Sequence, residues 1–199
     1  MTKPIPLEHD QYYHIYNRGN NRENLFRKSD NYHYFMQLYA KHIEPIAETF
    51  AYCLLPNHFH LLVRIKAMAE IDVTPANPPK KPSQYFSNLF NAYTKAFNNA
   101  YRRTGALFER PFGRLPVTSD AYFIQLVTYI HQNPQKHNLI NDFREWPYSS
   151  YRTMLGERPT HVQRAAVLDW FQGRTFFEKR HLQPIDEAYL EPLILEDFD

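Results

Sequence analysis

The sequence has a single cysteine, Cys53, among its 199 residues. One thiol cannot form an internal disulfide, and the sequence has no cysteine cluster that could hold zinc. It also has no apolar run long enough to cross a membrane, and its N-terminus lacks the pattern of a signal peptide. These absences exclude the disulfide-stapled and zinc-finger classes. They predict a soluble, cytoplasmic protein with no membrane partner.

The chain also has little net charge, with 23 Lys and Arg against 21 Asp and Glu, but the charges are unevenly distributed. The last seventeen residues, 183–199, hold six acids and no Lys or Arg, so the rest carries 23 basic against 15 acidic side chains. A basic body with an acidic tail fits a polyanion binder, although many proteins that bind no nucleic acid share this pattern. The 15 Tyr and 15 Phe could fill a core or stack on bases.

The hydrophobic pattern predicts the α+β class. Alternation and β-branched or aromatic residues indicate strands, whereas apolar steps of three and four indicate helices. We expect strands at 12–18, 48–55, 58–65 and 106–117, and helices at about 29–43, 83–103, 120–133 and 162–171. The helix ends are set by Gly105, a natural C-cap, and by Pro134, while four prolines between Ala67 and Pro82 indicate an irregular connection.

The order of these elements is βαββαβ, followed by one more helix. This order is typical of a ferredoxin-like antiparallel sheet with helices on one face. We therefore expect such a sheet, an added C-terminal helix that carries Tyr129, and a short helical tail. The expected domains are 1–152 and a helical extension, 153–199, which ends in the acidic tail.

Two histidines on the third expected strand are the first candidate site. His58 and His60 are two residues apart, so alternation places both on one face together with Leu62, while Phe59 and Leu61 take the other face. Two imidazoles side by side can bind one divalent metal ion. The alternative is that a half-exposed face merely tolerates them, since the chain has ten histidines.

The expected helix at 120–133 offers the second candidate site. At about 100° per residue, Tyr129 and Asn133 project on the same flank of a buried stripe, and His131 falls on the other flank. One helix edge thus presents a phenol and, one turn later, an amide oxygen. The alternative is an ordinary boundary aromatic and a residue that ends the helix.

Together these motifs resemble those of single-tyrosine transposases with a His-hydrophobic-His strand, and most closely the REP-associated tyrosine transposases. Leu-Leu-Pro-Asn-His-Phe-His-Leu-Leu-Val, around His58, resembles the histidine strand, and Tyr-Ile-His-Gln-Asn-Pro, from Tyr129, resembles the tyrosine helix. His14 to Gly19 looks like the first strand of that family, and Pro147 to Tyr151 like a recurrent downstream element. The likeness spans about residues 12–152.

The resemblance implies a metal-dependent endonuclease and strand transferase that acts on single-stranded DNA. His58, His60 and Asn133 would hold Mg²⁺ or Mn²⁺, and Tyr129 would attack the scissile phosphate to give a 5′-phosphotyrosine and a free 3′-OH. Family members recognise a DNA hairpin near the cut site and work as monomers or homodimers. Basic residues that could contact phosphate are Arg18, Arg22, Arg102, Arg103, Arg110 and Arg114.

Two other functions stay open on the sequence alone. A ferredoxin-like sheet can bind single-stranded nucleic acid without chemistry, by stacking bases on exposed aromatics. Candidates for that role are Tyr12, Tyr13, Tyr16, Phe59 and Phe112. Alternatively, all the aromatics could lie in the core of a protein-interaction domain.

Overall fold

The computed structural model describes residues 4–72 and 80–185. The acidic residues of the tail, Asp186 to Asp199, and three of the four expected linker prolines lie outside these ranges. The α+β class is confirmed. The elements are β1 (Tyr12–Arg18), α1 (Ser29–His42), β2 (Ala47–Leu54), β3 (His58–Ile65), α2 (Pro82–Ala100), β4 (Gly113–Pro116), α3 (Asp120–Lys136), α4 (Tyr151–Leu155), α5 (Arg164–Trp170) and α6 (Arg174–His181).

The four strands form one antiparallel sheet in the order β2-β3-β1-β4. β1 therefore lies between β3 and β4, with Tyr16 opposite His60 on one side and opposite Gly113 on the other. A Cβ at Gly113 would lie 2.1 Å from the ring of Tyr16, so any larger residue here would force that ring to move. The register thus places the beginning of β4 beside Tyr16, across β1 from His60.

The fourth strand lies at the edge of the sheet, as its prolines indicate, but it is shorter than the predicted range 106–117. Only 113–116 pair with β1, and the earlier part of the segment adds a single bridge between Gly19 and Phe108. Pro111 has no N–H to donate to a ladder, so pairing cannot run unbroken through it. Phe108 and Phe112 are buried instead and line a cavity beside α2.

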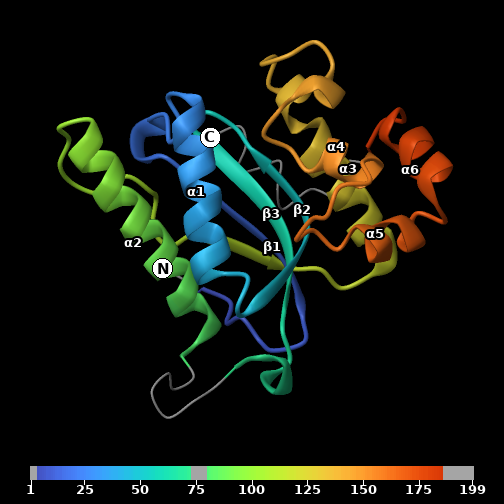
Figure 1. Ribbon diagram of the computed structural model, residues 1–199, viewed down its shortest axis with the longest axis horizontal. Coiled ribbons are helices and arrows are strands. Elements are labelled where there is room, and N and C mark those ends of the chain that lie inside the picture. Colours follow the sequence, from blue (N-terminus) through green and yellow to red (C-terminus); the bar gives the residue numbers. More distant parts are fainter. Residues whose placement is uncertain (1–3, 73–79, 186–199) are drawn as a thin grey trace.

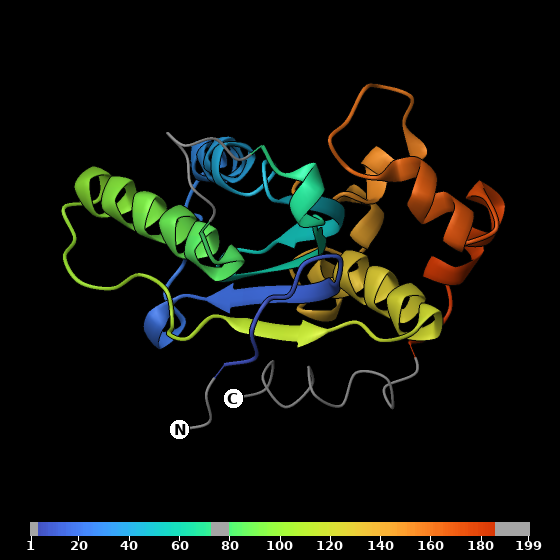
Figure 2. The same ribbon diagram turned by 90° about the horizontal axis from the view of Figure 1, so that it is seen from below.

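Helices cover both faces of the sheet (Figures 1 and 2). The apolar stripes of α1 and α2 pack on one face, against alternate side chains of β1 and β3 that include Ile15, Phe59, Leu61 and Val63. The opposite face carries α3, whose Phe123, Leu126, Val127 and Ile130 are fully buried as predicted. The part of the chain that the structure describes contains no helix long and apolar enough to span a membrane.

Helix ends differ from those predicted at two places. α2 ends at Ala100, and Arg102, with φ of 52°, is the left-handed residue that follows it, although Gly105 also has a positive φ, of 86°. α3 does not stop at Pro134 but continues to Lys136. A proline this close to a helix end removes only one hydrogen bond, and the N–H of His137 still donates to the carbonyl of Asn133. The additional turn brings Lys136 and His137 to the histidine strand.

The C-terminal helices join α3 through a buried chain of hydrogen bonds. His181 Nδ1 lies 2.7 Å from the carbonyl oxygen of Phe177, so it is the protonated nitrogen and donates. His181 Nε2 then accepts from His131 Nδ1 at 2.8 Å, and His131 Nε2 accepts from Ser150 Oγ at 2.7 Å. Both imidazoles are neutral in this arrangement. His131, predicted on the flank of the helix opposite Tyr129, anchors α6.

Acid should weaken this anchor. Burial lowers the pKa of His181 to about 4, and His131 and the charge of Arg180 face the same ring. In the unfolded chain His181 binds a proton below about pH 6.5, whereas in the folded chain it does so only near pH 4. Its contribution to the free energy of unfolding is therefore fully present above pH 6.5 and is lost as the pH falls from 6.5 to 4. We expect a loss of about 3 kcal/mol by pH 4 from this group alone.

Chemical denaturation between pH 7 and 4 measures this effect. His181→Gln keeps an acceptor for His131 but cannot take up a proton, so its stability should depend less steeply on pH. Equal slopes for the variant and the parent protein would show that His181 does not titrate in this way.

Candidate functional site

His58 and His60 lie on the face of β3 that packs against α3. Their neighbours in sequence, Phe59 and Leu61, point to the other face and join the core under α1 and α2. The two imidazole rings are 5.2 Å apart between centroids and nearly perpendicular. His60 is 3 % exposed, and His58 is half-buried. The alternation expected from the sequence therefore places both rings side by side.

A neighbouring amide sets the protonation of His58. Its Nδ1 lies 2.7 Å from Oδ1 of Asn57, in the turn between β2 and β3. An amide oxygen can only accept, so Nδ1 carries the proton and Nε2 carries the lone pair. This tautomer is the one that a metal ion requires of a histidine bound through Nε2.

His60 has a partner that the sequence analysis did not identify. His14, on β1, places its Nε2 3.0 Å from Nδ1 of His60, and the two rings are stacked. Burial lowers the pKa of His14 to about 3, and burial lowers the pKa of His60 well below its usual range, helped by His14 and His58. Both rings are therefore neutral near pH 7, as metal ligation requires. Nε2 of His60 is buried and makes no hydrogen bond.

Tyr129 reaches His60 from α3, and Asn133 lies one turn later on the same helix. The Tyr129 ring is 5.5 Å from the ring of His60, edge to face, and is 1 % exposed. Lys136 also lies over this phenol, with Nζ 4.9 Å from the ring centroid. The side chain of Asn133 is fully buried, and neither its amide oxygen nor its amide nitrogen makes a hydrogen bond. His137 also lies here, its ring 4.8 Å from that of His58.

These contacts fit a divalent metal ion. A buried amide and a buried imidazole nitrogen without hydrogen bonds are costly unless something binds them. Among the described residues, no three His, Cys, Asp or Glu side chains converge on one point. A metal ion bound by His58 and His60 would therefore need a ligand of another type, and the amide oxygen of Asn133 would complete a neutral N,N,O set.

Lys136 and His137 could not be assigned to the site from the sequence. Both follow Pro134, where the helix was predicted to have ended. His14 was the one candidate that the sequence could have indicated, because it lies two residues from Tyr16 on an expected strand and so shares a face with it. However, the contact between His14 and His60 depends on the pairing of β1 with β3, which no local pattern specifies.

The six candidate arginines lie in different local settings. Arg103 donates to both carboxylate oxygens of Glu23 and to backbone carbonyls, so its guanidinium supports the loop that follows α2. Arg18 lies 3.6 Å from Glu109. Arg110 and Arg114 line a cavity beside α2, on the opposite face of the sheet from the histidines. Arg22 ends a short 3-10 helix (Asn20–Arg22), and Arg102 lies in the turn after α2, both with left-handed φ.

No family model matches the chain. Its sequence is 31 % identical over 107 residues to a Haemophilus influenzae protein provisionally named a REP-associated tyrosine transposase. That match covers 52 % of this chain and 58 % of the relative, so it spans less than two thirds of the relative's length. Among solved structures, the fold matches that of a REP-associated tyrosine transposase bound to a REP hairpin, with a TM-score of 0.56 and 17 % identity. This second match covers 78 % of this chain and 84 % of the other. The sequence match and the shared fold together confirm the predicted resemblance of this chain to the REP-associated tyrosine transposases.

Proposed function

We propose that the protein is a metal-dependent endonuclease and strand transferase for single-stranded DNA that acts through a tyrosine. The observation that supports this most is the cluster on the α3 face of the sheet. His58 has the tautomer that binding through Nε2 requires, and His60 has a buried Nε2 that makes no hydrogen bond. The amide of Asn133 is also buried without a hydrogen bond, and the ring of Tyr129 lies against His60. The sequence match to a transposase-like relative supports the same reaction class.

His58, His60 and Asn133 would hold Mg²⁺ or Mn²⁺. When bound, the ion would act as a Lewis acid toward the phosphate that is cut. Asn57 and His14 would orient the two imidazoles through the hydrogen bonds that they make to the far nitrogens.

Tyr129 is the proposed nucleophile. Its oxygen would form a bond to phosphorus while the bond from phosphorus to the 3′ oxygen breaks, and the leaving oxygen takes a proton to become a 3′-OH. The ammonium of Lys136, over the ring, would stabilise negative charge on the phenol oxygen as it loses its own proton. Attack by another 3′-OH reverses the step, so joining a strand needs no nucleotide cofactor.

The substrate must displace part of the cover on Tyr129. With the residue 1 % exposed, the phosphate cannot reach it unless neighbouring side chains move. Lys136 is exposed and lies over the ring, so it can swing outward and contact the phosphate. We propose that DNA binding brings about this movement.

A single chain contributes every proposed group. His60, on β3, and Tyr129, on α3, are in contact within one molecule. We therefore propose that a monomer is competent for cleavage. The solved relative is bound to a REP hairpin, and we propose a hairpin-bearing single strand as the substrate here also.

A covalent-adduct assay tests the proposed function. Labelled single-stranded oligonucleotides from the DNA that flanks the gene are incubated with protein and Mn²⁺ and analysed on a denaturing gel. We expect a labelled protein band that chelator abolishes, and peptide mapping should place the label on Tyr129. Tight DNA binding with no adduct on any oligonucleotide would instead indicate a DNA-binding protein without catalysis.

A further inference from the structure

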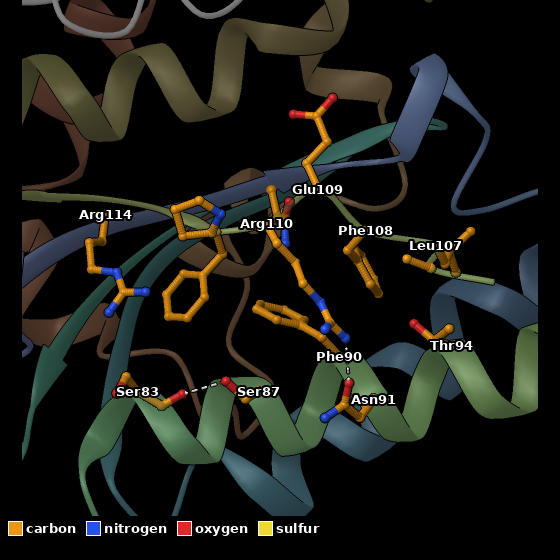
Figure 3. Close-up of a pocket in the computed structure, with 14 residues that line it drawn as sticks. Ser83, Ser87, Phe90, Asn91, Thr94, Leu107, Phe108, Glu109, Arg110 and Arg114 are labelled. Atoms are coloured by element: carbon orange, nitrogen blue, oxygen red, sulfur yellow. Dashed lines mark hydrogen bonds between the residues drawn. The ribbon is translucent and has the colours of Figure 1, made fainter. Parts of the chain in front are cut away.

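A cavity of about 360 Å³ lies between α2 and residues 106–114, on the face of the sheet away from Tyr129 (Figure 3). Its volume is in the range of small-molecule sites, about 300–1,000 Å³. Three phenylalanines contribute to its apolar wall, and polar side chains of β1, α2, β4 and the segment before β4 also line it. The phenylalanines are Phe90, Phe108 and Phe112.

Asn17, on β1, brings a buried donor to this cavity. The residue is 5 % exposed, and its Oδ1 accepts from the backbone N–H of Arg18 at 2.8 Å. That bond fixes the orientation of the amide, because a backbone N–H needs an acceptor. Nδ2 is therefore a donor, and it is buried without a hydrogen bond. A buried amide N–H without a partner is costly, so the geometry favours a ligand that carries an acceptor.

Arg114 and Arg110 bring positive charge to the same cavity. The guanidinium of Arg114 lies 3.8 Å from the centroid of the Phe112 ring, and its Nε is buried without a hydrogen bond. Its NH1 reaches only a backbone carbonyl, at 3.4 Å, and Arg110 reaches the amide oxygen of Asn91, at 3.2 Å. Within residues 4–72 and 80–185, neither arginine forms an ion pair with a carboxylate. The uncompensated charge favours an anionic ligand.

The one acid of the cavity wall does not cancel this charge. Glu109 lies near Arg18, on β1, at 3.6 Å. Figure 3 shows its carboxylate pointing away from α2, whereas Arg110 points down toward Asn91. The cavity therefore combines donors of hydrogen bonds, cationic groups and an aromatic wall.

We propose that this cavity binds one unpaired nucleotide of the DNA strand, with its base against the phenylalanines. Nδ2 of Asn17 would donate to an acceptor on the base edge, and Arg110 and Arg114 would contact the adjoining phosphate. β4 pairs only with β1 in the described sheet and so forms its edge. A DNA strand that passes around this edge would connect the cavity with the face that carries Tyr129. The inference rests on the proposed function, because it takes DNA as the substrate.

The test measures binding without catalysis. Tyr129→Phe protein in chelator is incubated with a pool of hairpin oligonucleotides whose unpaired flanks are randomised, and the bound DNA is sequenced. The same selection is made with Asn17→Ala, with Ser87→Phe, which fills the cavity, and with Arg174→Ala, a control at an exposed arginine on α6. Thermal unfolding shows that each variant is folded.

We expect a base preference at one unpaired position that Asn17→Ala lowers about fivefold, as for one lost hydrogen bond, and that Ser87→Phe abolishes. Arg110→Ala should weaken binding to all sequences and lower the salt dependence by about one ion. Arg174→Ala should change neither. An unchanged preference in Asn17→Ala and Ser87→Phe, or an equal loss of affinity for every base, would overturn the inference. If the parent protein formed no adduct but the base preference still depended on Asn17, the cavity would be supported as a nucleotide site although the proposed cleavage had failed.

Discussion

A Tyr129→Phe variant is expected to form no covalent adduct with DNA and to lose cleavage by about a thousandfold or more. The substitution removes the proposed nucleophile, and the phenyl ring still fills the buried space beside His60. Binding of hairpin DNA should persist, because the substitution leaves Lys136 and the proposed phosphate contacts of Arg110 and Arg114 in place. Denaturing gels measure the adduct, and fluorescence anisotropy measures binding.

Tyr122→Phe is the matched control, because Tyr122 lies on the same helix, two turns before Tyr129, and is half-buried. It should leave adduct formation unchanged. An adduct that survives in Tyr129→Phe, or one that both variants lose equally, would show that Tyr129 is not the nucleophile.

His60→Ala should have the second-largest effect, a loss of cleavage of about a thousandfold or more, because it removes a proposed metal ligand. It also leaves Nε2 of His14 without its partner, so a stability loss of about 1–3 kcal/mol is expected. Titration with Mn²⁺, followed by electron paramagnetic resonance, measures the affinity for the metal directly. This reading separates a lost ligand from a merely less stable protein.

His14→Ala gives a graded comparison. His14 would orient His60 without touching the metal, so its loss should lower Mn²⁺ affinity by about ten- to a hundredfold and less than His60→Ala does. His161, which is 83 % exposed, provides the control, and His161→Ala should not alter Mn²⁺ affinity. Equal Mn²⁺ affinity in the parent protein and in His60→Ala would exclude the proposed ligand set.

The structure also bears on the other two functions that the sequence left open. A domain that stacks bases on a bare sheet needs one uncovered face, but helices cover both faces here (Figures 1 and 2). Tyr13 and Phe59, two of the aromatics expected to stack, are buried at 3 % and 0 % exposure. The reading that all aromatics are core does not account for the buried, unbonded polar atoms of His60 and Asn133.

Local patterns in the sequence were sufficient for the class of fold and for part of the site. Alternation along 58–65 placed His58 and His60 together, since a strand has a period of two whatever it packs against. Helical spacing likewise predicted the buried stripe of α3 and the common direction of Tyr129 and Asn133. The roles of these residues as ligands and nucleophile, the six arginine contacts and the division at residue 152 stay predictions.

The tertiary structure decided the rest, because those features depend on contacts between segments distant in sequence. Strand register sets His14 beside His60, and no periodicity within β1 encodes that pairing. Packing of α6 buries His131, which helical geometry alone had left on a flank. α3 can continue past Pro134 because the proline costs it only one hydrogen bond so close to the helix end. The local rule that a helix stops at a proline overestimates this cost. The sequence by itself thus determined which residues share a face, and the fold determined which faces meet.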